Sequence, residues 1–81
     1  MHSPPIWTSD TDKYRIRSVI GQRVRRLRER QALSQATLAS KARIAQPYLS
    51  RLEAGVQRNP SIAVLKRLAK ALGVPVTALL E

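Results

Sequence analysis

Four side chains in one short stretch have the types and spacing needed to contact the edges of base pairs. A helix turns by about 100° per residue, so Gln46, Pro47, Ser50 and Arg51 fall on one face. Arginine donates paired hydrogen bonds to guanine, glutamine pairs with adenine, and small apolar groups contact thymine methyls. This face predicts base reading in the major groove of DNA. Arg51 is expected on guanine, Gln46 on adenine directly or through water, and the Pro47 ring on a thymine methyl.

Two short helices separated by a few residues are expected to position this face. The first begins at Ser34, whose hydroxyl can cap the free N–H groups of a first turn. The second begins near Ala45 or Gln46 and stops at Gly55, because glycine readily adopts the left-handed conformation that ends a helix. The apolar sides are expected to hold Leu38, Ala39 and Ala42 in the first helix and Ala45, Leu49 and Leu52 in the second.

These two helices resemble the helix-turn-helix of the phage-repressor family, of the Cro/repressor or XRE type. The matching frame reads S-Q-x-x-L-A-x-x-A and then Y-L-S-R-L-E-x-G. Flanking matches, R-V-R-R-L-R before it and P-S-I-x-x-L-K-R-L-A-K-A-L-G-V after it, extend the resemblance over residues 19–81. The resemblance implies an all-α fold, a compact five-helix repressor-like DNA-binding domain containing a helix-turn-helix.

The chain departs from the family frame at two positions in the turn. Arg43 stands where the family usually has glycine, and a positive φ there would cost about 1 kcal/mol. Ala45 stands where the family usually has a serine or threonine cap, which forfeits about 0.5–2 kcal/mol of capping. Both departures weaken the turn, and neither removes the outer face of the second helix.

Four other residues are predicted to contact DNA phosphates. Gln35 begins the first motif helix, where an amide and free N–H groups suit a phosphate oxygen. Tyr48 lies at the border of the two faces, so its ring is expected in the core and its hydroxyl on a phosphate. The resemblance implies that the loop after the second helix, with Arg58 and Asn59, also grips the backbone.

An ion pair between Arg28 and Glu53 is implied by the same resemblance. Arg28 lies on the flank of the Val24 and Leu27 stripe, and in the family the matching arginine pairs with the glutamate of L-E-x-G. Such a pair would position the motif and would not read DNA. If it is buried, deletion of one partner should cost several kcal/mol, because the other charge is stranded.

The rest of the chain divides into an arm and a domain. Residues 1–10 contain two prolines and no periodic pattern, which predicts a flexible N-terminal arm. Its Trp7 is either a residue of an unstructured tail or an anchor on the domain or a second subunit. Residues 11–81 are expected to form the helix-turn-helix domain, and the pattern over residues 11–31 fits either one long helix or two.

Two more helices are expected after the motif. Ser61 should cap a fourth helix that runs through Leu72 and ends at Gly73, and Pro75 should start a last short one. The apolar residues of that last helix, Val76, Leu79 and Leu80, exceed what a small core needs. Family members often pair through this end, so a homodimer through the C-terminal helices is expected.

The composition narrows the class of function. Fifteen Lys and Arg against five Asp and Glu give a formal charge of +10, which favours a polyanionic partner over a merely solvated surface. The chain has no cysteine, and its single histidine, His2, lies in the arm. We therefore expect no catalytic residue, no metal and no cofactor. No apolar run reaches the roughly 20 residues of a membrane span, so a cytoplasmic location is expected and no membrane partner.

The sequence thus predicts a double-stranded DNA-binding transcriptional regulator, a repressor or autoregulator that binds a palindromic operator as a dimer. A protein–protein adaptor or antitoxin-type partner-binding protein on the same fold is the alternative. Its sign would be an apolar or acidic outer face over residues 46–51, and the face is neither. RNA binding is a third option, which the shortage of aromatic residues for base stacking disfavours.

Overall fold

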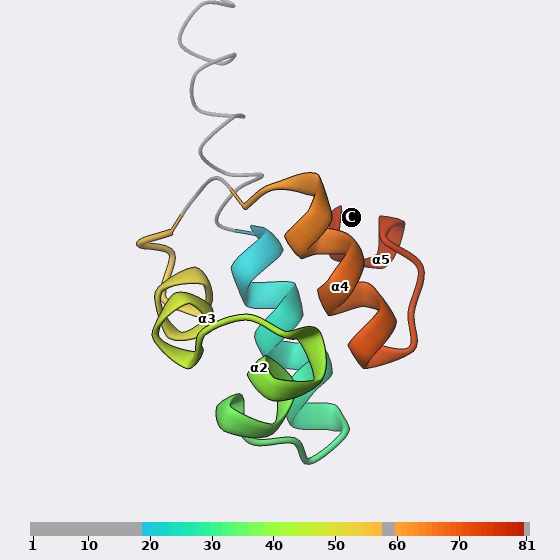
Figure 1. Ribbon diagram of the computed structural model, residues 1–81. Coiled ribbons are helices and arrows are strands. Elements are labelled where there is room, and N and C mark those ends of the chain that lie inside the picture. The colour runs from blue at the N-terminus through green and yellow to red at the C-terminus, as the bar shows by residue number, and fades with distance from the viewer. Residues whose placement is uncertain (1–18, 58–59, 81) are drawn as a thin grey trace, which may run out of the picture.

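The computed structural model describes residues 19–57 and 60–80, and within these ranges all regular secondary structure is helical. A first helical segment covers residues 19–30 and is followed by α2 (Gln35–Ala42), α3 (Gln46–Glu53), α4 (Ile62–Leu72) and α5 (Thr77–Leu80). The 19–30 segment runs through the centre of Figure 1, with α3 on its left and α4 and α5 on its right. The predicted all-α, five-helix fold is confirmed. The arm, Trp7 and the choice between one helix and two lie outside the described residues.

Helices α2 and α4 begin with the serine caps expected from the sequence. The Ser34 hydroxyl accepts a hydrogen bond of 3.0 Å from the backbone N–H of Thr37. The Ser61 hydroxyl accepts one of 3.1 Å from the N–H of Val64. Each bond satisfies one of the N–H groups that a first helical turn leaves without an intrahelical acceptor.

The helix ends also follow the sequence, with one correction. Gly55 and Gly73 both have positive φ, of 82° and 70°, as expected for residues that end α3 and α4. The last helix, however, begins at Thr77 and not at Pro75. The Pro75 carbonyl accepts a 2.9 Å hydrogen bond from the N–H of Ala78, so residues 75–78 form a turn that leads into α5.

A single apolar core holds the helices together. Its largest fully buried side chains are Val24, Leu38, Leu49, Leu52, Leu68 and Leu79. Helix α2 packs against both α3 and α4, and α5 closes the core against α4. None of the described helices is long and apolar enough to cross a membrane.

The core departs from the sequence prediction at Ala45. This residue is exposed and precedes α3 as its N-cap, with φ −70° and ψ 138°. Its backbone is extended, so the helical spacing that would have aligned it with Leu49 and Leu52 does not apply to it. Ala42, at the end of α2, is buried as expected.

Candidate nucleic-acid interface

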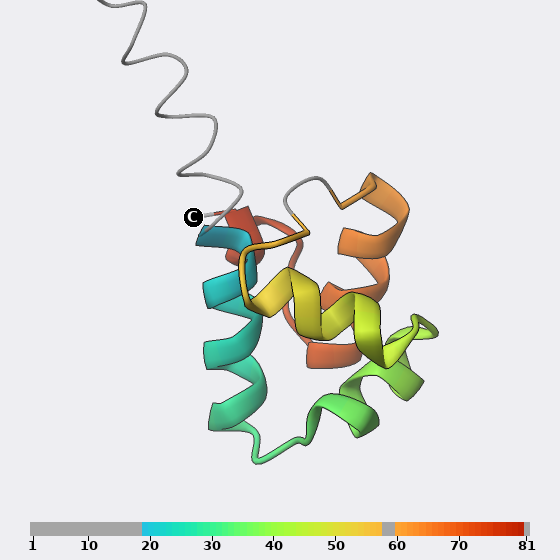
Figure 2. The same ribbon diagram turned by 90° about the vertical axis from the view of Figure 1, so that its left-hand side faces the viewer.

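The four predicted base-reading residues lie together on the outer face of α3. Gln46, Pro47, Ser50 and Arg51 are all exposed, and the opposite face is fixed in the core. Figure 2 shows α3 crossing the front of the molecule, where no other helix covers it. Pro47 lies in the first turn, where a missing N–H removes no helical hydrogen bond. The outer face of α3 therefore carries one cation and one amide, and the width of an α-helix fits a major groove.

The turn that leads into α3 forms although Arg43 and Ala45 are both unfavourable at their positions. Arg43 adopts the left-handed conformation, with φ 58° and ψ 47°, and its N–H bonds back to the carbonyls of Ala39 and Ser40. The Ile44 N–H donates to the Ala39 carbonyl at 3.0 Å. Ala45 makes no side-chain capping bond, so the α3 N-terminus lacks that stabilisation. Backbone hydrogen bonds alone therefore form this turn.

The Arg28–Glu53 pair is present and is almost completely buried. Arg28 Nε donates to Glu53 Oε2 at 2.8 Å, and Arg28 Nη2 donates to Oε1 at 2.9 Å. Only 12% of the Arg28 side chain and 3% of the Glu53 side chain are exposed. The hydrogen bonding to Glu53 raises the pKa of Arg28, against an opposing effect of burial. The pair fastens α3 to the 19–30 segment and so fixes the direction of the outer face.

Arg28 also holds the connection between the first two helices. Its Nη1 donates to the Leu33 carbonyl at 2.8 Å, just before the Ser34 cap. Nearby, Gln31 Nε2 donates to the Leu72 carbonyl at 2.7 Å, which ties the same connection to the end of α4. The Arg28 bond is local, whereas the Gln31 bond joins residues 41 apart in sequence, and no local pattern predicted it.

Gln35 has an intramolecular partner that the sequence did not reveal. Its Nε2 donates to Glu53 Oε1 at 3.0 Å, and its side chain is half-buried. The same carboxylate oxygen thus accepts from Gln35 and from Arg28. The structure therefore gives Gln35 a positioning role between α2 and α3. A phosphate contact would use its remaining amide groups or the N–H groups of the first turn of α2, and it stays a prediction.

Of the other three residues predicted to contact phosphates, only Tyr48 lies within the described part of the chain. Tyr48 is half-buried, in agreement with its expected place at the border of the two faces of α3. Arg58 and Asn59 lie outside the described residues, so their contact with phosphates stays a prediction from the sequence.

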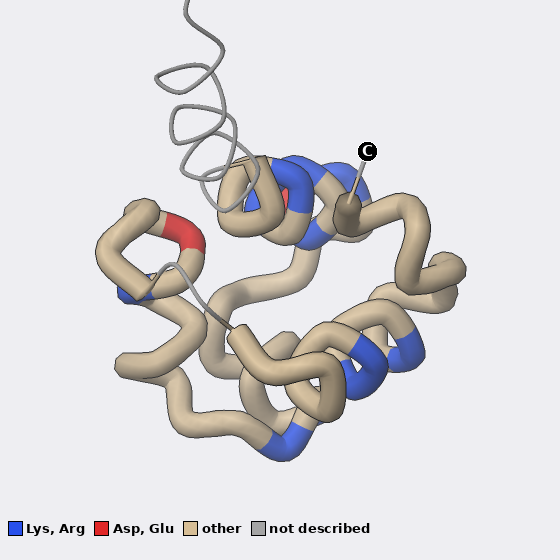
Figure 3. Tube along the Cα trace, turned by 90° about the horizontal axis from the view of Figure 1, so that it is seen from above, with Lys and Arg blue, Asp and Glu red and all other residues tan. Residues whose placement is uncertain are grey.

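The surface of the described residues is strongly cationic because they include eleven Lys and Arg and only two acidic residues. Glu53 is bound by Arg28, and the exposed Glu29 pairs with Arg25 at 3.2 Å. These two are the acidic residues of ranges 19–57 and 60–80. Figure 3 shows Lys and Arg on several helices, with only these acidic positions among them. Such a surface attracts polyanions and releases their condensed counterions on binding.

Comparisons with known proteins agree with this geometry. Residues 24–79 match the family model described as helix-turn-helix. The transcriptional regulator SinR of Bacillus subtilis is 41% identical over 63 residues, which are 78% of this chain and 57% of SinR. The immunity repressor of Bacillus phage phi105 is 38% identical over 60 residues, 74% of this chain and 41% of the repressor. The chain thus spans about half the length of these relatives.

The fold comparison gives the same answer. A crystal structure of SinR, a regulator of biofilm formation, in complex with DNA superposes with a TM-score of 0.74 at 42% identity. The match covers 76% of this chain and 98% of that one. The chain therefore belongs to the helix-turn-helix family, of the XRE type found in SinR and in phage repressors.

Proposed function

We propose that the protein is a transcriptional regulator that binds double-stranded DNA in a sequence-specific manner. The observation on which the proposal rests is the outer face of α3, where Gln46 and Arg51 are both exposed. The buried Arg28–Glu53 pair holds this helix in place. The likeness to SinR, which is solved in complex with DNA, supports it. The cationic surface supplies the sequence-independent attraction that such a protein needs.

In this proposal, the side chains divide into two groups. Arg51 and Gln46 read guanine and adenine, and Pro47 and Ser50 contact the neighbouring base edges. Gln35, Tyr48, Arg58 and Asn59 contact phosphates and set the register of α3 in the groove. Contacts of the first group give sequence choice, whereas those of the second raise affinity for every duplex alike.

We further propose that two copies bind a palindromic operator and repress transcription. One α3 covers only a few base pairs, and a two-fold dimer with half-sites about 34 Å apart doubles the sequence that is read. The proposed seam consists of α5, where Leu80 is 44% exposed, and of Val76, which directly precedes α5 and is half-buried. Leu79 is fully buried in the monomer core and so is not part of the seam.

The alternative function, an adaptor that binds a protein through the same face, has less support. An adaptor would present an apolar or acidic surface on α3, whereas the exposed residues of this face are polar or cationic apart from Pro47. A gel shift with a duplex, a single strand and a structured RNA, each at two salt concentrations, separates the possibilities. We expect the duplex to bind best and to weaken steeply with salt. Equal binding of all three nucleic acids would contradict sequence-specific duplex recognition.

A further inference from the structure

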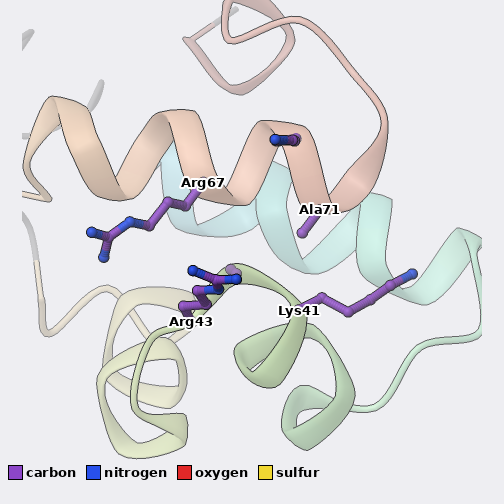
Figure 4. A pocket seen from close by; sticks show the side chains of 6 residues that line it. Lys41, Arg43, Arg67 and Ala71 are labelled. Carbon is purple, nitrogen blue, oxygen red and sulfur yellow. The ribbon is translucent and has the colours of Figure 1, made fainter.

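A cleft of about 580 Å³ lies between the end of α2 and the second half of α4. Its lining consists of Lys41, Ala42, Arg43, Arg67, Lys70 and Ala71, four of them cationic and none acidic. In Figure 4, Arg43 and Arg67 point toward the same space at one end, and Lys41 extends toward the other end. The positive charges are therefore spread along the cleft, with the small Ala71 side chain between them.

None of these four cations has a counter-ion within the described part of the chain. Lys41, Arg43, Arg67 and Lys70 are exposed, and the described salt bridges involve other residues. Cations that line one cleft without an acid among them repel one another. An anion in the cleft would remove that repulsion.

Helix dipoles explain only part of the cluster. Lys41 and Lys70 stand in the last turns of α2 and α4, where a cation is favoured by the negative end of the helix. Arg67 lies further from the end of α4. Arg43 occupies a left-handed position that favours glycine, and the turn is formed by its backbone N–H and not by its side chain. Helix dipoles therefore do not account for the presence of Arg43 and Arg67 in the cleft.

We propose that this cleft binds a small molecule that carries more than one phosphate group, in the class of inorganic polyphosphates and nucleoside polyphosphates. Guanidinium groups match phosphate oxygens through paired hydrogen bonds, and charges at both ends of the cleft suit a ligand with several anionic groups. The volume is in the range of small-molecule sites. No α3 residue lines the cleft, so the site is separate from the proposed DNA-reading face and goes beyond the proposed function.

The site nevertheless adjoins the recognition helix. Arg43 is three residues before Gln46, the first residue of α3. A ligand held by Arg43 and Arg67 would bridge the turn of the motif to α4. The cleft thus offers a small anion a place beside the start of α3 without occupying its outer face.

Titration of the ¹⁵N-labelled protein with inorganic triphosphate, at constant ionic strength, tests the proposal. We expect saturable amide shifts centred on residues 41–43 and 67–71. A double variant, Arg43→Gly with Arg67→Gln, should weaken binding about tenfold or more, which corresponds to about 1.4 kcal/mol. The matched control is Lys66→Gln, which removes an exposed cation of α4 that does not line the cleft. It should leave the dissociation constant almost unchanged, and the spectrum of each variant reports whether it is folded.

Four results would overturn the proposal. Shifts that do not saturate and spread over all cationic residues would show only diffuse attraction, as would equal losses in Lys66→Gln and in the double variant. A DNA duplex that shifts the same amides and displaces triphosphate would make the DNA backbone the source of the phosphate. Hexaglutamate that binds the cleft more tightly than triphosphate would point to an acidic protein segment. If the protein binds triphosphate in the cleft but does not bind duplex DNA, the proposed function is contradicted and the proposed anion site is not.

Discussion

Gly21 lies directly against the backbone carbonyl of Leu52, at the end of α3. A Cβ atom added at Gly21 would overlap the Leu52 oxygen and would lie 3.4 Å from the Cα of Glu53. The 19–30 segment and α3 therefore approach each other backbone to backbone at this point. Arg28, two turns further along the same segment, binds the Glu53 side chain. Together, these two contacts fix the position of α3 against the 19–30 segment.

Replacement of Gly21 by alanine should destabilise the protein, although alanine favours a helix by about 0.5–1 kcal/mol over glycine. The added methyl group meets backbone atoms that cannot move aside cheaply, and such overpacking costs about 1–3 kcal/mol. Chemical denaturation measures the change. The exposed neighbour provides the control, because Gln22→Ala should change stability by less than about 0.5 kcal/mol. If the Gly21→Ala protein is as stable as the wild type, Gly21 does not lie directly against the Leu52 carbonyl.

Removal of the Glu53 charge should lower the free energy of unfolding far more than removal of the exposed Glu29 charge. Glu53→Gln leaves the Arg28 guanidinium buried beside a neutral partner, and loss of one member of a buried pair costs about 3–5 kcal/mol. Glu29→Gln breaks the Arg25 pair, whose side chains are more than half exposed, and should cost less than about 1 kcal/mol. Thermal unfolding of the two variants gives the comparison. Equal destabilisation would contradict a positioning role for the Arg28–Glu53 pair.

Replacement of Arg43 by glycine should stabilise the protein by about 1 kcal/mol, because glycine adopts a φ of 58° without the clash of a Cβ atom. Arg43→Ala is the matched control, since it removes the same charge and keeps the Cβ atom. Denaturation midpoints of the two variants separate the backbone effect from the charge effect. If alanine stabilises the protein as much as glycine does, charge repulsion in the cleft and not backbone strain is responsible.

Local chemistry made the helix boundaries and the outer face predictable. The caps Ser34 and Ser61, the terminators Gly55 and Gly73, and the buried Leu49 and Leu52 each depend on neighbours within about four residues, a range that the sequence displays directly. Two predictions failed at helix starts, because an extended residue or a turn before a helix breaks its periodicity: the last helix begins two residues after Pro75, and Ala45 is exposed and not on the apolar side of α3.

The tertiary contacts needed the structure. Gln35 and Glu53 are 18 residues apart, and their bond depends on the angle between α2 and α3. Nothing in the residues around Gly21 indicates that its missing side chain makes room for the Leu52 carbonyl. The cationic cleft joins residues 41–43 to residues 67–71, which no spacing rule brings together. The Arg28–Glu53 pair was expected only because the family resemblance implied it.

Arg58→Ala should weaken binding of every duplex by a similar factor and reduce the slope of log affinity against log salt by about one. The reason is that a phosphate contact carries no sequence information. Affinities for several duplexes at several salt concentrations measure this effect, with Lys66→Gln as the control for loss of one exposed cation. A loss that depends on the duplex sequence would assign Arg58 to base reading.

The central claim is that the outer face of α3 reads base pairs, and selection from a random duplex pool tests it most directly. The experiment compares the wild type with Arg51→Ala, a substitution of an exposed residue. The wild type should select a two-fold symmetric consensus. The variant should lose its preference for one guanine in each half-site, worth about 1–3 kcal/mol, and keep the remaining positions. An unchanged consensus in Arg51→Ala, or no consensus for the wild type, would contradict the account.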